Sequence, residues 1–405
     1  MRIPADSRRY DPENYTKGFL DTIMKFTMSR SGTLEALAPM MCAVGKSDLP
    51  GTEGILIEAK APNLCTLTSY DTEKGVRTEM EVTVEEEGTY IIPAQKFLQT
   101  LKVMEGDEIT LEVDAKLIVC ISSGKSSHKM SAMKSDQFPT IPRLKTERGF
   151  EVGQSILKKM LSKVAFAMGT NDQRAVLNGC FFRVTENTLH LVSCDTFRIA
   201  RCTVETPVQD KSEDAGNLNF SFIVPVKTVN ELQRLLSDGE EESVRIHLSR
   251  KFIVFEIGEI IFFSRLIDGE YIDYDRIIMR EHRIFVELEK AVLISALERA
   301  ALVTEERIAH NVRAHVKFVF EEQLLKILAT SVAGSTYDEI EVDKEGGDLT
   351  IAFNNRFLIE TIRACESKRI KISMSTASAS INIEPVEPEA GTDDLFMMMP
   401  VRIKE

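Results

Sequence analysis

The sequence lacks several features that would assign it to a familiar class of protein. No apolar run is long enough to cross a membrane as a helix. Residues 1–23 lack the uninterrupted apolar segment of a signal peptide, so we interpret them as a flexible polar extension ahead of Met24. Seven cysteines are scattered without CxxC spacing, which argues against a zinc site or a disulfide framework. We therefore expect a cytoplasmic protein without a membrane partner.

Catalytic motifs are also missing. The six histidines show no His-Glu-x-x-His spacing, and the chain has neither GxSxG nor a glycine-rich phosphate loop. Cys194 beside Asp195 and the six histidines are the remaining candidates for chemistry. His190 lies in an alternating strand pattern, where a hydrogen-bonded or exposed imidazole is more common than a metal ligand. We therefore predict no enzyme activity, no metal and no cofactor.

What the sequence does contain is a repeat of about 125 residues. Its 405 residues, 43% apolar and 28% charged, indicate a globular protein of more than one domain. "TLTSYDT" (66–72) recurs as "HLVSCDT" (190–196), and "YIIPAQKFLQTL" (90–101) recurs as "FIVPVKTVNELQRLL" (222–236) and "TIAFNNRFLIETIRA" (350–364). Asp71 and Asp195 occupy the same place in two repeats, which favours turn chemistry at a strand end over an acid–base pair.

These repeats predict an α+β fold of three similar domains, each with two helices and antiparallel sheets. After the extension over 1–23 we place the domains at 24–145, 146–279 and 280–405. Apolar residues at helical spacing predict six helices, which we place at 30–44, 94–102, 153–168, 227–236, 286–305 and 354–369.

Charge is distributed unevenly between these helices and the remaining chain. The formal net charge is −13, which on its face argues against nucleic acid. The six helical segments nevertheless hold 14 basic and eight acidic residues, a net +6, and the remainder carries −19. One explanation is that Lys and Arg are good helix formers on solvated faces. The other is that the helices share one surface that faces an anion such as DNA.

Several motifs together resemble the bacterial sliding clamp, the β subunit of DNA polymerase III. The motifs are "RAVLNGCFFRVTENTLHLVSCDTFRIA" (174–200), "FIVPVKTVNELQRLL" (222–236), "IIFFSRLIDGEYIDYDRII" (260–278) and "MMMPVRI" (397–403), in the same order as in that family. The resemblance implies a head-to-tail homodimeric ring of six similar domains, with helices lining a central hole. It implies a processivity factor that encircles double-stranded DNA without reading its sequence. The implied partners are the replicative DNA polymerase, a clamp loader and other clamp-binding replication and repair proteins.

The resemblance also implies site residues. A groove between domains 2 and 3 would bind partner peptides through Arg174, Val176, Leu177, Cys194, Thr196, Phe197, Arg198, Ile199, Ile272, Arg276, Ile277, Met397, Met399, Pro400, Val401 and Arg402. Contacts to DNA phosphates would come from Lys46, Lys96, Lys158, Lys159, Lys163, Lys227, Arg234, Arg356 and Arg363. The dimer interface would include Leu302 and Val303.

Some positions depart from the family pattern. Thr196-Phe197 stands where the family usually has Gly-His, and Ile272 stands where it often has Pro. We therefore expect a reshaped groove with its own peptide preference. The segment "PVEPEAGTDD" (385–394) is expected to form a mobile acidic loop.

Two alternatives remain open from the residues themselves. The chain could be a repeat-built scaffold that binds proteins and has no role on DNA. The terminal methionines could also be core: Met397, Met399 and Val401 alternate as the inward face of a last strand would. Methionine is flexible and polarisable, however, which suits a surface shared by many partners.

Overall fold

The computed structural model describes residues 21–45, 49–141, 148–212, 218–304, 315–331 and 334–402. The chain forms two compact units, one from residues 1–146 and 246–265 and the other from residues 147–245 and 266–405. We describe each unit by itself. Among the described residues, none of the helices has the length and apolarity to span a membrane.

The first unit is built from antiparallel strands and two helices. Five strands pair in the order β5-β1-β7-β8-β9; they are β1 (Thr22–Ser29), β5 (Thr83–Glu86), β7 (Glu108–Asp114), β8 (Ile118–Ser123) and β9 (Ser126–Ser131). Seven others follow the order β10-β6-β2-β3-β4-β19-β18; they are β2 (Gly54–Lys60), β3 (Leu64–Tyr70), β4 (Lys74–Glu81), β6 (Gly88–Pro93), β10 (Met133–Lys134), β18 (Phe252–Ile257) and β19 (Ile260–Arg265). The helical segments are α2 (Arg30–Met40), η1 (Met41–Ala43), α3 (Ala94–Val103) and η2 (Ser135–Gln137). The boundary between the units falls within β17 (Ser243–Leu248).

The second unit contains a nine-stranded and a four-stranded sheet. The larger follows the order β16-β12-β13-β14-β28-β27-β26-β20-β24; its strands are β12 (Gly179–Val184), β13 (Thr188–Cys194), β14 (Arg198–Glu205), β16 (Phe220–Pro225), β20 (Ile284–Glu289), β24 (Asp343–Glu345), β26 (Arg369–Met374), β27 (Ile381–Pro385) and β28 (Thr392–Met398). The smaller follows β23-β22-β21-β25, formed by β21 (Val316–Glu321), β22 (Leu324–Ser331), β23 (Gly334–Glu341) and β25 (Leu349–Phe353). A short pair joins β11 (Arg148–Gly153) to β15 (Gln209–Asp210).

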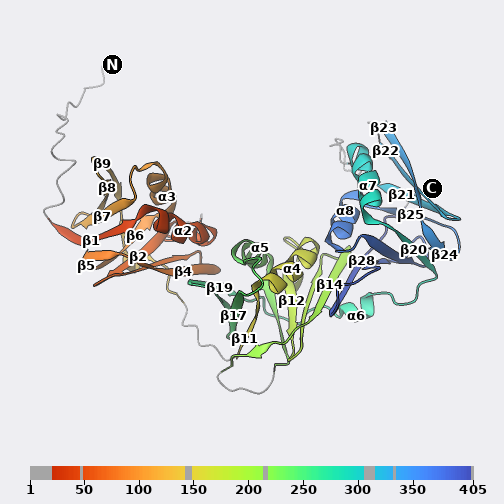
Figure 1. The fold of residues 1–405 in the computed structure, drawn as a ribbon, viewed down its shortest axis with the longest axis horizontal. Coiled ribbons are helices and arrows are strands. Elements are labelled where there is room, and N and C mark those ends of the chain that lie inside the picture. Colours follow the sequence, from red (N-terminus) through yellow and green to blue (C-terminus); the bar gives the residue numbers. More distant parts are fainter. Residues whose placement is uncertain are drawn as a thin grey trace, which may run out of the picture. The chain divides into compact units, whose positions relative to one another are not determined.

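Helices of the second unit pack in pairs. They are α4 (Gln154–Val164) with α5 (Val226–Leu235), and α7 (Lys290–Thr304) with α8 (Asn355–Ala364). Shorter turns are η3 (Ala165–Ala167), η4 (Ala175–Asn178) and α6 (Tyr274–Ile277). Figure 1 shows α4 and α5 lying together beside β12 and β14, and α7 lying beside α8. In the first unit α2 packs on α3 in the same way. The predicted α+β repeat with two helices per copy is therefore confirmed.

Two predicted helices are too long. The segment predicted as helix 286–305 begins as strand β20, and α7 starts only at Lys290. Side chains of β20 alternate between buried and partly exposed, as expected of a strand with one face in the core. The helix predicted over 354–369 ends at Ala364, because the chain enters β26 at Arg369. Asn354 caps the start of α8 by accepting a hydrogen bond from the backbone N–H of Phe357.

The recurring Asp-Thr motif forms the same tight turn in both units. Asp71 Oδ1 accepts the backbone N–H groups of residues 73 and 74 at 3.0 and 2.8 Å. Asp195 Oδ1 accepts those of residues 197 and 198, both at 3.1 Å. The threonine that follows each aspartate has a positive φ, 80° at Thr72 and 76° at Thr196. A positive φ at threonine is strained and needs support from neighbouring groups, which the aspartate hydrogen bonds provide. Both aspartates therefore shape a turn, and the prediction of turn chemistry is confirmed.

Candidate functional site

The C-terminal strand lies in the interior of the large sheet. β28 pairs with β14 through Met397 opposite Ile199 and Met398 opposite Arg198, and it pairs with β27 on its other side. Both methionines are almost fully buried, and the strand ends at Met398. Met399 is 40% exposed, and Val401 is also exposed. The alternative in which residues 397, 399 and 401 alternate on one inward face is therefore wrong, because the strand ends at Met398, before the second of them.

An apolar cluster lies beneath the residues predicted to form the groove. We call it the subsurface cluster; its buried members are Leu177, Val192, Cys194, Ile199, Ile223, Tyr271, Ile278, Leu395 and Met397, and Val176, Phe181, Ile267, Ile272 and Tyr274 pack against it. Six residues of the predicted groove thus come together here. Four of them, Leu177, Cys194, Ile199 and Met397, are buried and can only support a bound partner from below. Burial also raises the pKa of the Cys194 thiol, which keeps it neutral and apolar.

Large apolar side chains are exposed more often at the predicted sites than elsewhere. Ten large apolar side chains are exposed among the described residues, and five of them belong to the predicted sites. Four form what we call the exposed apolar set: Phe197, Ile277, Met399 and Val401. The backbone N–H of Met399 donates to the carbonyl of Phe197 at 2.8 Å, so the tail is tied to the Asp-Thr turn. Contiguous exposed apolar surface commonly marks an interaction site.

Polar residues border the set. Arg174 and Arg276 are largely exposed, although each reaches a nearby aspartate: Arg174 Nε lies 3.4 Å from Asp172, and Arg276 Nε lies 2.9 Å from Asp273. Thr196 and Arg402 are exposed, and Pro400 is half-buried. Arg276 and Arg402 adjoin Ile277 and Val401 in the chain, and exposed guanidinium groups next to apolar residues suit a ligand that carries acidic or carbonyl groups beside apolar anchors.

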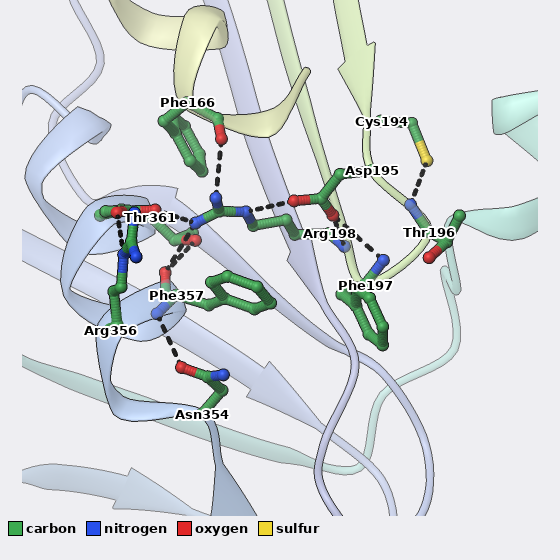
Figure 2. A network of polar contacts seen from close by, with 11 residues as sticks. Phe166, Cys194, Asp195, Thr196, Phe197, Arg198, Asn354, Arg356, Phe357 and Thr361 are labelled. Atoms are coloured by element: carbon green, nitrogen blue, oxygen red, sulfur yellow. Dashed lines mark hydrogen bonds and ion pairs between the residues drawn. The ribbon is translucent and has the colours of Figure 1, made fainter. Parts of the chain in front are cut away.

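Arg198 holds the turn from beneath. Only 5% of this residue is exposed, so it supports the surface and does not line it as predicted. Its Nε donates to Asp195 Oδ2 at 2.9 Å, and the same aspartate fixes the backbone of the turn that presents Phe197. Figure 2 shows this carboxylate between the guanidinium and the turn.

The far end of Arg198 reaches two further elements. One terminal nitrogen donates to the carbonyl of Phe166 in η3 at 2.7 Å, and the other lies 2.7 Å from Glu360 in α8. The guanidinium lies between the rings of Phe166 and Phe357, 4.8 and 4.3 Å from their centres (Figure 2). Burial raises the pKa of Glu360, but hydrogen bonds from Arg356 and Arg198 outweigh it, so that pKa lies below its usual value.

This network shows what sequence reasoning missed. Phe357 contacts Phe197 with ring centres 5.8 Å apart, yet it was not predicted because a phenylalanine at helical spacing looks like ordinary core. In the first repeat the equivalent of Arg198 is Lys74, whose Nζ donates to Asp71 and to the carbonyl of Cys42, its two hydrogen-bond partners among the described residues. A guanidinium can connect several acceptors at once, whereas an ammonium is a compact point charge.

The lysines predicted to contact DNA from α4 are not equivalent. Lys163 is only 3% exposed and pairs at 2.7 Å with the buried carboxylate of Asp394. It cannot reach a phosphate, so this prediction is corrected. Lys158 and Lys159 remain at the surface, paired with Asp238 and with Glu366 and Glu389 respectively. The charge count along the helix did not predict this, because the partner of Lys163, Asp394, lies on β28, far away in the sequence.

The acidic loop predicted over residues 385–394 is shorter than expected. β27 extends to Pro385 and β28 begins at Thr392, so only residues 386–391 connect the strands. Asp394 belongs to β28 and is buried. Glu389, within the connection, forms an ion pair with Lys159.

The remaining basic residues are exposed. Lys96 lies on α3 and Lys227 on α5. Arg234, Arg356 and Arg363 each pair with a glutamate, Glu231, Glu360 and Glu298, at 3.3, 2.9 and 2.6 Å. Exposed ion pairs are weak, so a phosphate can replace the carboxylate at little cost. Lys46 lies outside the described residues.

The predicted dimer residues differ in exposure. Leu302, near the end of α7, is 79% exposed, whereas Val303 is buried against its own unit. Val303 therefore cannot contact a second subunit as predicted. α7 packs on β22 and β23, and Arg299 joins the helix to β23 by contacts of 3.0 and 2.6 Å with Asp338. β23 is the edge strand of its sheet and pairs there with β22.

Comparison with known proteins now identifies the family. Models of the N-terminal, central and C-terminal domains of the DNA polymerase III beta subunit match residues 24–142, 151–273 and 275–400. The chain belongs to the DNA polymerase III beta subunit family. Within this family the three matched domains account for the repeat. Phe197 of the exposed apolar set lies in the central domain, whereas Ile277 and Met399 lie near the start and the end of the C-terminal domain.

Individual members of the family are similar over most of the chain. The beta sliding clamp of Staphylococcus epidermidis is 27% identical over 391 residues, which cover 94% of this chain and all of that protein. A sliding clamp from Pseudomonas aeruginosa, solved bound to griselimycin, is 27% identical with a TM-score of 0.83. The beta subunit from Thermotoga maritima is 26% identical with a TM-score of 0.82. Both structures cover 94% of this chain, and this chain covers all of each.

Proposed function

We propose that this protein is a DNA sliding clamp, a processivity factor that encircles duplex DNA and tethers the replicative polymerase. The observation that carries the proposal is the family match, which extends over three successive domains between residues 24 and 400. Two subunits associate head to tail into a ring, and a clamp loader opens it around DNA in the cytoplasm. The role is topological, because encirclement keeps the polymerase at high effective concentration near its template.

The helix pairs of the three domains face the DNA. Contacts go to phosphates, which carry no sequence information, so the clamp can move along any duplex. We assign them to the basic residues that remain at the surface, namely Lys96, Lys158, Lys159, Lys227, Arg234, Arg356 and Arg363. We assign the three domains to residues 24–145, 146–279 and 280–405, as the repeat predicts.

Partner proteins bind through a short peptide on the exposed apolar set. Phe197, Ile277, Met399 and Val401 provide apolar contacts, while the subsurface cluster holds them in place. Arg174, Arg276 and Arg402 border this surface and orient the polar groups of the peptide. Phe197 replaces the histidine usual in the family, so the surface here offers a larger ring that is apolar throughout.

Changes in the exposed apolar set test this assignment. Met399→Ala and Ile277→Ala should each weaken binding of a fluorescein-labelled hexapeptide ending in Leu-Phe by about tenfold, because truncating a buried anchor costs roughly 1–2 kcal/mol or more. Deleting residues 399–405 should abolish binding and leave the fold intact, since β28 ends at Met398. Fluorescence anisotropy measures the affinity, and circular dichroism reports the fold.

Ile261→Ala is the matched control, because Ile261 is an exposed apolar residue of β19 in the other unit. It should bind the peptide like the wild type. Deleting residues 397–405 is expected to destabilise the unit as well, because it removes two buried strand positions. Full affinity in the folded 399–405 deletion would show that the tail is not part of the site.

A further inference from the structure

The short helix α6 has little of its own to hold it. It consists of four residues, none of them buried, and Asp273 makes no side-chain cap at its start. A single turn is not stable by itself, because nucleating a helix costs more than one hydrogen bond returns. Two residues of the proposed peptide site, Arg276 and Ile277, nevertheless lie on it. Their positions must be set by contacts elsewhere.

Tyr274, the first residue of α6, makes such a contact. Its hydroxyl lies 2.8 Å from Nε2 of His190 on β13, and Nδ1 of His190 lies 2.6 Å from the hydroxyl of Thr203 on β14. The tyrosine ring also packs near Phe181 of β12, with ring centres 6.1 Å apart. Tyr274 thus connects α6 directly to β12 and β13 and, through His190, to β14.

The imidazole is suited to this role. Burial lowers the pKa of His190 to about 4, so the ring is neutral near pH 7. A neutral imidazole has one N–H donor and one acceptor nitrogen. Both hydroxyl partners can donate or accept, so either tautomer satisfies the chain from Thr203 to Tyr274. The backbone N–H of Ile278 in turn donates to the carbonyl of Tyr274 at 3.0 Å. This hydrogen bond connects the end of α6 to the residue that is held by His190.

We propose that Tyr274 and His190 are positioning residues that hold Ile277 at the correct height for a bound peptide. The inference rests on the proposed function of this surface. It adds a hydrogen-bonded chain that starts at the first residue of the turn that carries Arg276 and Ile277. Neither Tyr274 nor His190 touches the peptide.

Replacing the hydroxyl tests the proposal. Tyr274→Phe should weaken the labelled Leu-Phe hexapeptide roughly fivefold, since it removes one hydrogen bond and leaves a half-buried nitrogen of His190 without its partner. His190→Leu should cause a similar loss. Tyr337→Phe is the matched control, because the Tyr337 hydroxyl bonds Glu339 on exposed β23; it should bind like the wild type.

A double-mutant cycle separates positioning from general weakening. If Tyr274 acts through Ile277, Tyr274→Phe should have little further effect in an Ile277→Ala background, but its full effect in a Met399→Ala background. An equal loss in both backgrounds, or full affinity in Tyr274→Phe, would overturn the proposal.

Amide hydrogen exchange tests, without any peptide, whether the Tyr274 hydroxyl stabilises α6. The amide of Ile278 should exchange several-fold faster in Tyr274→Phe than in the wild type, because the turn opens more often. Unchanged exchange would refute the anchor itself. A wild-type protein that fails to bind the peptide while its Ile278 amide still responds to Tyr274→Phe would refute the proposed peptide site and leave the anchor standing.

Discussion

Arg198→Met should lower the free energy of unfolding of the second unit by about 3 kcal/mol, the scale expected when one partner of a buried ion pair is removed. The substitution keeps an unbranched side chain but leaves Asp195 and Glu360 without the guanidinium between them. It also frees the carbonyls of Phe166 and Phe357. Chemical denaturation followed by circular dichroism measures the change.

Arg234→Met is the control for this experiment. Arg234 is also paired with a glutamate, but it is largely exposed and its partner lies three residues earlier on α5. Its replacement should change the unfolding free energy by less than about 0.5 kcal/mol. If Arg198→Met unfolds at the wild-type denaturant concentration, the network in Figure 2 does not hold the turn.

Peptide affinity should fall with Arg198→Met even where the protein remains folded, because the turn presents Phe197.

Leu302→Asp should convert the dimer into monomers. In the proposed ring Leu302 packs against the other subunit, and burying an unpaired carboxylate there costs about 3 kcal/mol or more, roughly a hundredfold in the dissociation constant. Light scattering should then report a mass near 45.6 kDa. Val303 is left unchanged, because it is buried within its own unit and its truncation would test the fold.

Val103→Asp is matched to this change, since Val103 at the end of α3 has the same 79% exposure as Leu302. It should remain dimeric. A Leu302→Asp protein that still elutes and scatters as a dimer would show that the subunits meet elsewhere.

Much of the fold follows from periodicity within each repeat. The helices of the first two repeats begin within a residue of their predicted positions, because apolar residues at helical spacing follow strands that end at Ser29, Pro93, Gly153 and Pro225, which are residue types common at helix starts. The start of α7 was missed because "VELE" continues an alternating strand into a helical pattern without a breaker. The pattern therefore predicts a helix that runs through β20 as well.

Predictions for the site failed where a contact comes from a distant segment. The place of Lys163 on a helix predicts a surface lysine, but it is buried against Asp394 of β28. The place of Met397 in the tail predicts a groove residue, but it is buried within β28, between β14 and β27. The strand that packs against a helix depends on the strand order of the sheet. The periodicity of apolar residues along the chain does not specify that order. Tyr274 was missed for the same reason, since its importance comes from His190, 84 residues earlier.

Retention on circular DNA tests the central claim most directly. The clamp is loaded onto a nicked circular plasmid by a clamp loader and then filtered at about 200 mM salt, where a protein held only by several phosphate contacts loses affinity by roughly a thousandfold or more relative to 50 mM. A ring that encircles the duplex should remain with the circle. It should dissociate once a single restriction cut gives it free ends to slide from. Equal loss from circular and linear DNA would contradict encirclement and would favour a protein-binding scaffold without a topological hold on DNA.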